Sequence, residues 1–114
     1  MQQQEECERK LERWTVPFVE AGISLAVMAV VRRGEVDARE AAGHIADYTA
    51  GFMTVDEAKI APELEALVQK GYAERHNGRY RITALGKRHM YHMLRQWNRY
   101  VDSMNNLWGC YYGT

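Results

Sequence analysis

The sequence predicts a mainly α-helical domain of the α+β class. Three observations lead to this prediction. Apolar residues recur at helical spacing in five segments, one stretch near residue 80 alternates apolar and polar residues as strands do, and an Asn-Gly pair divides that stretch in two. The chain of 114 residues has the length of one domain. With 46% hydrophobic residues and 2 prolines, its composition is that of a globular chain and not of a disordered one.

The chain begins with two predicted helices of opposite character. The apolar residues of the first, over 2–15, form one narrow stripe that runs on into the second: Cys7, Leu11, Trp14 and Phe18. Such a polar helix cannot bury itself alone, so we expect it to dock on another element or subunit. The second, over 18–33, is apolar nearly all round and ends at Gly34. We expect a central buried helix here; a buried strand is the alternative, but the segment is long for a strand.

Two capped helices follow. Asp37, with a glutamate three residues later, is typical of a capping box and begins a helix that stops at Gly51. Thr54 with Glu57 repeats this pattern and begins the next helix, which ends at Gly71. The apolar residues of this second capped helix recur at i, i+4, i+7 and i+8, the spacing of a core-facing stripe: Ile60, Leu64, Leu67 and Val68.

The stretch 72–83 predicts a β-hairpin. Its two halves are joined by Asn77 and Gly78, the preferred pair for a two-residue type I′ turn, in which both residues have positive φ. In the second half, Tyr80 and Ile82 are expected to face the core, and the two arginines that alternate with them are expected to face outward.

The last predicted element is a long helix. Thr83 is the predicted cap at its start, and Gly109 is the predicted end. Its apolar residues form a heptad seam at spacings of four and three: Met90, Leu94, Trp97, Val101, Met104 and Trp108. We therefore divide the chain into three parts. Residues 1–83 hold the N-terminal helix and the helices and hairpin that follow it (the winged domain described below), residues 84–109 form the long helix, which we assign below to dimerisation, and residues 110–114 form a tail.

The order of helix, helix, capped helix, basic hairpin and long helix is that of a winged helix-turn-helix domain. In that design the helix before the hairpin enters the DNA major groove, and the hairpin, or wing, lies along the phosphates. A small α+β domain that binds no nucleic acid is the alternative.

Several motifs resemble the PadR-like family of transcriptional regulators. Four residues match that family's Leu-Tyr-Pro-x-Leu-x-x-Leu-x-x-x-Gly pattern position by position: Pro62, Leu64, Leu67 and Gly71. The wing over 78–86 and the helix over 22–31 are also similar, and 96–107 resembles the single C-terminal helix of the small subgroup. The resemblance implies a homodimeric DNA-binding regulator, in most members a repressor, which a small molecule can release from DNA.

The formal net charge of zero conceals two charged blocks. Residues 35–65 hold eight acids and two bases, whereas residues 70–99 hold eight bases and one acid. Such asymmetry favours a polyanionic partner for one face of the molecule. Self-complementary packing between the two blocks, or between subunits, is the alternative.

We expect double-stranded DNA as the partner. The expected DNA contacts come from the two capped helices, the loop between them and the wing: Arg39, Thr54, Lys59, Arg75, His76, Asn77, Arg79 and Arg81. Two copies would place these helices in successive major grooves of a pseudo-palindromic operator. About six phosphate contacts per dimer would give a log–log salt slope near about −5. The acidic residues of the capped helices favour the other hypothesis, a winged-helix protein-interaction module without DNA binding.

An exposed seam must be covered, so we expect a homodimer. Its expected interface combines the seam with two residues of the first helix: Leu11, Trp14, Met90, Leu94, Trp97, Val101, Met104 and Trp108. Folding of the last helix back onto its own domain is the alternative. Trp97 is also the expected ligand-binding residue for a small aromatic effector, because flat aromatic or cationic molecules stack between paired rings. An interface tryptophan without a ligand is the alternative.

No enzyme, cofactor or metal site is expected. His89 and His92 are three residues apart on a helix, but no further Cys or His motif completes a metal site, and there is no phosphate loop or nucleophile elbow. The longest apolar run, 25–31, is far shorter than the ~20 residues of a membrane helix, and the first residues lack the pattern of a signal peptide. Two cysteines are too few for a disulfide framework, which favours a cytoplasmic protein.

Overall fold

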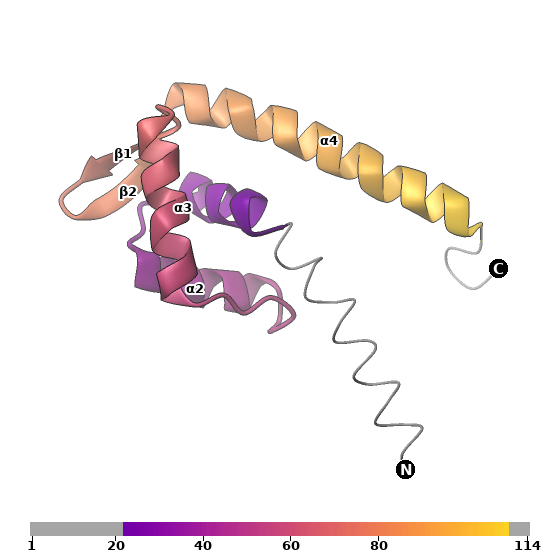
Figure 1. Cartoon of the computed structure of the whole chain (residues 1–114), viewed down its shortest axis with the longest axis horizontal. Coiled ribbons are helices and arrows are strands. Elements are labelled where there is room, and N and C mark those ends of the chain that lie inside the picture. The colour runs from indigo at the N-terminus through magenta and orange to yellow at the C-terminus, as the bar shows by residue number, and fades with distance from the viewer. Residues whose placement is uncertain (1–21, 110–114) are drawn as a thin grey trace, which may run out of the picture.

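The computed structural model describes residues 22–109, which form four helices and a two-stranded antiparallel sheet that lies at one edge of the helices (Figure 1). The elements in chain order are a helix over 22–33, α2 (Ala38–Tyr48), α3 (Glu57–Gln69), β1 (Ala73–His76), β2 (Arg79–Ile82) and α4 (Ala84–Trp108). This is the predicted mainly α, winged helix-turn-helix arrangement. The predicted helix over 2–15, with Leu11 and Trp14, and the tail over 110–114 lie outside the described residues.

The core lies where the first three described helices meet the hairpin and the start of α4. Val27, Met28 and Val31 of the helix over 22–33 are almost fully buried, which confirms a buried helix there. Each of the other elements adds one apolar stripe, and the buried residues of these stripes include Ala41, Ile45, Ile60, Leu64, Leu67, Ala73 and Met90. Because these stripes face inward, the opposite faces of α2 and α3 remain exposed.

The start of α2 is as predicted, but the start of α3 is not. Asp37 accepts a hydrogen bond from the Glu40 backbone N–H at 2.7 Å, and the Glu40 side chain reaches back to Asp37, so the capping box is present. The prediction that Thr54 caps α3 is wrong: the N-cap is Asp56, without a side-chain cap bond, and Thr54 is exposed in the preceding loop. Met53 and Val55 on either side of Thr54 are buried, which holds this segment extended and delays the helix.

The hairpin has the predicted turn and one contact that the sequence did not indicate. His76 pairs with Arg79, which leaves Asn77 and Gly78 as a two-residue turn with φ of 53° and 76°. Val36, in the loop before α2, forms an isolated bridge to Tyr80 through backbone hydrogen bonds of 3.1 and 2.8 Å. This bridge fixes the start of α2 against the wing.

Helix α4 is joined to the wing by a short polar link. The Thr83 hydroxyl accepts a hydrogen bond from the Gly86 N–H at 3.0 Å, as predicted for a cap, and donates to the Gly71 carbonyl at 2.6 Å. The far end of α4 extends beyond the rest of the fold and ends at Gly109 with a positive φ (Figure 1). In the described part of the chain, no helix is long and apolar enough to cross a membrane.

Candidate nucleic-acid interface

The exposed face of α3 carries one cation and mostly small side chains. Burial of Ile60 and Leu64 turns Lys59 outward, beside the exposed Ala58 and Pro62. Lys59 is in the first turns of α3, the end that enters the major groove in a helix-turn-helix protein. Among residues 22–109 it forms no ion pair, so its ammonium group is free to meet a phosphate.

The two acids further along α3 are engaged by other parts of the same chain. Glu63 accepts a hydrogen bond of 3.0 Å from the Ser24 hydroxyl. Glu65 forms an ion pair with Arg75 and accepts a hydrogen bond from the Tyr80 hydroxyl. The carboxylates of Glu63 and Glu65 are therefore held at the flanks of α3. The exposed charged side chains at the start of the helix are Lys59, Glu57 and the N-cap Asp56.

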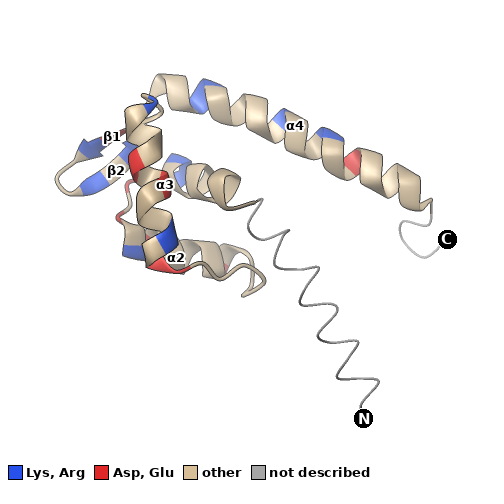
Figure 2. Ribbon diagram, in the orientation of Figure 1, with Lys and Arg blue, Asp and Glu red and all other residues tan. Residues whose placement is uncertain are grey.

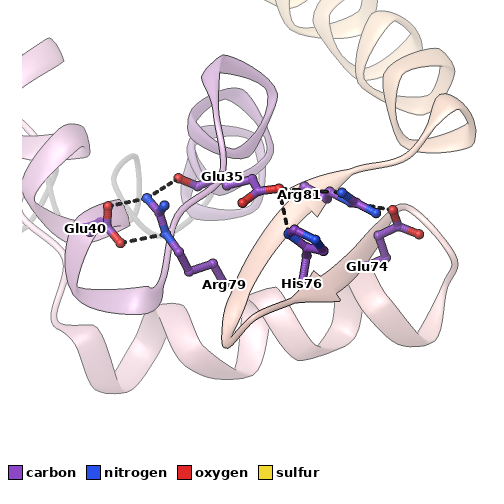
Figure 3. A network of polar contacts seen from close by, with 6 residues as sticks. All are labelled: Glu35, Glu40, Glu74, His76, Arg79 and Arg81. Carbon is purple, nitrogen blue, oxygen red and sulfur yellow. Dashed lines mark hydrogen bonds and ion pairs between the residues drawn. The ribbon is translucent and has the colours of Figure 1, made fainter.

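The wing cations are also engaged, in an arrangement that we call the wing ion cluster (Figure 3). Its members come from the loop before α2, from α2 and from both strands: Glu35, Glu40, Glu74, His76, Arg79 and Arg81. Arg79 makes two hydrogen bonds to the Glu40 carboxylate, at 2.6 and 3.1 Å, and a third to the Glu35 carbonyl at 2.7 Å. Such bidentate pairing is the strongest form that an arginine–carboxylate contact takes.

The Glu35 carboxylate occupies the centre of the wing ion cluster (Figure 3). Its Oε1 atom lies 3.1 Å from Nδ1 of His76 and 3.7 Å from Nη1 of Arg81. Arg81 also donates to Glu74 across the hairpin at 2.5 Å. The contact with His76 is an ion pair only when the imidazole is protonated, since a neutral ring loses the charge on which the attraction depends.

These contacts give the two charged blocks of the sequence a structural explanation. Figure 2 shows basic residues of the hairpin beside acidic residues of α2 and α3. Glu35, Glu40 and Glu65 of the acidic block pair with wing residues of the basic block. For these residues the alternative of self-complementary packing within the chain is observed. The sequence left this alternative open because the partners lie far apart along the chain: Arg79 is 39 residues after Glu40 and 44 residues after Glu35.

The other expected DNA contacts are exposed and remain predictions. Arg39 on α2, Thr54 before α3 and Asn77 at the wing tip are all exposed. The structure therefore brings Arg75, His76, Arg79 and Arg81 together in the wing with acidic partners, whereas Arg39 and Lys59 on the capped helices have no ion-pair partner among residues 22–109.

A groove lies between α4 and the helix over 22–33. It has a volume of about 630 Å³ and is lined by Leu25, His89, His92, Met93, Gln96, Trp97 and Tyr100. A neighbouring cavity of about 290 Å³ shares both histidines and adds Tyr72, Leu85 and Arg88. His89 stacks on Tyr72 with ring centroids 4.1 Å apart. None of these lining residues is acidic, and no group of three or more potential metal-ligating side chains occurs in the part of the chain that the structure describes.

The predicted seam of α4 divides into two parts. Met90 is 2% exposed and therefore belongs to the core of its own chain, and the half-buried Leu94 packs against that core. Val101 and Met104 are half-buried. The large apolar residues that remain exposed on the outer part of α4 are Trp97, Tyr100, Leu107 and Trp108, at 39%, 49%, 79% and 71%. Tyr100 and Leu107 were not in the predicted seam.

Two solved structures are similar to this fold. A transcriptional regulator from Clostridium thermocellum, Cth-833, superposes with a TM-score of 0.70 at 17% identity, over 79% of this chain and 93% of that one. The protein smu.1704 from Streptococcus mutans UA159 gives a TM-score of 0.57 at 19% identity, over 75% and 84%. At these identities the likeness establishes the fold alone. The sequence matches no protein-family model and no curated protein.

Proposed function

We propose that the chain is a DNA-binding transcriptional regulator of PadR-like type that represses as a homodimer. The observation that carries the proposal is the exposed face of α3, where Lys59 lies beside the small side chains of Ala58 and Pro62, and Glu63 and Glu65 are bound to other elements. Asp56 and Glu57 are the exposed acids at the start of this helix. A winged-helix protein presents this surface to the major groove. The fold shared with a transcriptional regulator supports the same reading.

The test is a mobility shift with DNA from the region upstream of the protein's own gene. Lys59→Glu should weaken binding about tenfold or more, because it replaces a phosphate contact with repulsion in each subunit. Lys87→Glu is the matched control, since Lys87 is an exposed lysine on α4, beyond the opposite end of α3. An equal loss of DNA affinity in both variants would show that binding responds only to the overall charge of the protein. No loss of DNA affinity in Lys59→Glu would contradict the proposed docking of α3 in the major groove.

We propose that the homodimer forms through the exposed apolar residues of outer α4. Four large apolar side chains on one helix are a surface that a soluble protein normally covers, and two-fold pairing of identical helices covers both copies at once. Leu107→Glu should lower the sedimentation-derived mass from dimer to monomer, whereas Asn106→Glu, at an exposed position that is already polar, should not. A monomeric unmodified protein at micromolar concentration would refute the dimer.

The groove beside Trp97 is the proposed effector site. Apolar and aromatic walls suit a flat ring, and none of the lining residues within 22–109 is acidic, which disfavours a cationic ligand relative to a neutral or anionic one. Aromatic compounds that quench tryptophan fluorescence should lose this effect in Trp97→Phe and keep it in Trp108→Phe. A panel of neutral, anionic and cationic naphthalene derivatives without any quenching would contradict the effector site.

The neutralised wing favours a second candidate function, a winged-helix module that binds a protein. Three wing arginines already have carboxylate partners, which reduces the electrostatic attraction for DNA. The mobility shift separates the two candidates, because a protein-binding module would give no shift at 50 mM salt with any duplex.

A further inference from the structure

We propose that Glu35 sets the affinity of the wing for phosphate groups. In this proposal the Glu35 carboxylate occupies the position that a backbone phosphate would take between Arg81 and His76, so a polyanion reaches the wing only by displacing it. The inference rests on the proposed function for its biological meaning, but it can be tested without an operator.

The position of Glu35 is imposed by the backbone. The next residue, Val36, is hydrogen-bonded to Tyr80 in both directions, at 3.1 and 2.8 Å. Tyr80 lies between Arg79 and Arg81 on β2, so this bridge holds Glu35 opposite the two arginines. The carbonyl of Glu35 accepts from Arg79 at 2.7 Å, and its carboxylate lies 3.7 Å from Arg81. Glu35 is therefore held at the wing by main-chain bonds that persist whatever its side chain does.

The charges of the wing ion cluster do not attract a polyanion as they stand. Three carboxylates face two guanidinium groups and one imidazole, so the cluster has no net positive charge even when His76 is protonated. Carboxylate and phosphate oxygens bind arginine with the same forked geometry. A phosphate must therefore exchange with a carboxylate. An arginine that stays paired with a carboxylate neutralises no phosphate, and so it releases none of the cations condensed on the polyanion.

Glu35 differs from the other two carboxylates in what else it does. Glu40 completes the capping box of α2, so removing its charge disturbs that helix as well as Arg79. Glu74 is on the wing and contacts only Arg81 among the ion pairs of the described residues. Glu35 faces two wing cations, and its main-chain bonds remain in Glu35→Gln. The amide has the same shape as the carboxylate without its charge.

The experiment measures binding to heparin and to a random 20-base-pair duplex as a function of salt. Asp102→Asn on α4 is the matched control, since it removes one negative charge far along the chain from the wing and has no ion-pair partner among residues 22–109. We expect Glu35→Gln to bind both polyanions about three- to tenfold more tightly than Asp102→Asn, with a steeper salt dependence. Adding Arg81→Gln to Glu35→Gln should remove most of this gain.

The outcomes separate this proposal from the proposed function. Equal affinities of Glu35→Gln and Asp102→Asn, or a gain that survives Arg81→Gln unchanged, would overturn the role of Glu35. Failure of the operator mobility shift would refute the proposed function and leave the heparin result standing. Circular dichroism checks the fold; if Glu35→Gln does not fold, Glu35→Ala provides the test with the same gain expected, because it also removes the carboxylate from Arg81 and His76 and leaves the backbone bonds of Val36 in place.

Discussion

Gly86→Ala is expected to destabilise the fold strongly although it places a better helix former in a helix. Gly86 is buried in the first turn of α4, where the helix passes close to the chain at Tyr72. A Cβ atom at Gly86 would lie 2.8 Å from Cγ1 of Ile82 and 2.9 Å from the carbonyl carbon of Tyr72, and nearer still to the Tyr72 carbonyl oxygen. Backbone atoms cannot rotate away, so α4 must move outward.

The magnitude follows from these contacts. Overpacking of this kind costs about 1–3 kcal/mol, and a shift of α4 also strains the 3.0 Å hydrogen bond from Thr83 N–H to the Tyr72 carbonyl, worth about 1 kcal/mol. The helix propensity of alanine offsets about 0.5–1 kcal/mol. We expect a net loss of about 2–3 kcal/mol in the free energy of unfolding, or roughly 8–12 °C in Tm.

Urea denaturation followed by circular dichroism measures this loss. Gly43→Ala is the matched control, because Gly43 lies within α2 and a Cβ there meets no atom within 4 Å. That variant should be more stable by about 0.5–1 kcal/mol. The close approach of α4 to Tyr72 would be refuted if Gly86→Ala were as stable as the unmodified protein while Gly43→Ala were more stable.

Three further predictions concern the core, the turn and the salt response. Met90→Ala should lower the free energy of unfolding by about 2–4 kcal/mol at every protein concentration in urea titrations; a loss that vanished on dilution would place Met90 in an interface instead. Asn77→Val should cost about 1–2 kcal/mol in the same assay because Asn77 has a φ of 53°, whereas Asn77→Gly should be nearly neutral. The log–log salt slope of DNA binding should be flatter than the slope of about −5 expected from the sequence, at about −3 to −4, because wing arginines that stay paired with carboxylates neutralise fewer phosphates and release fewer of the cations condensed on the DNA; a slope of about −5 or steeper in filter-binding titrations would contradict this.

Local signals predicted most of the elements. The capping box at Asp37, the Asn77–Gly78 turn and the cap at Thr83 depend on side chains within three residues of the backbone groups that they satisfy, and all three are present. Thr54 failed as a cap for a non-local reason: Met53 and Val55 are buried by the rest of the fold, which keeps this segment extended past the position where the helix pattern begins.

The sequence predicted which residues make up the candidate site, but not which of them are paired with carboxylates. The sequence indicated Lys59 on the outward face of its helix, because helical periodicity alone determines that side once the core stripe is known. It did not indicate that the wing arginines are paired. Coulomb attraction depends on distance in space, and the partners of Arg79 at Glu35 and Glu40 become neighbours only when Val36 pairs with Tyr80.

The heptad seam shows the same division between what the sequence determined and what the tertiary structure decided. Spacing of apolar residues established by itself that α4 is a long amphipathic helix. The spacing could not show which part of this apolar stripe packs against the chain's own core. Periodicity identifies the apolar face of a helix, but not the element that packs against it. The tertiary structure buried Met90 in the core, packed the half-buried Leu94 against it, and left Trp97, Tyr100, Leu107 and Trp108 exposed, since the far end of α4 extends beyond the rest of the fold.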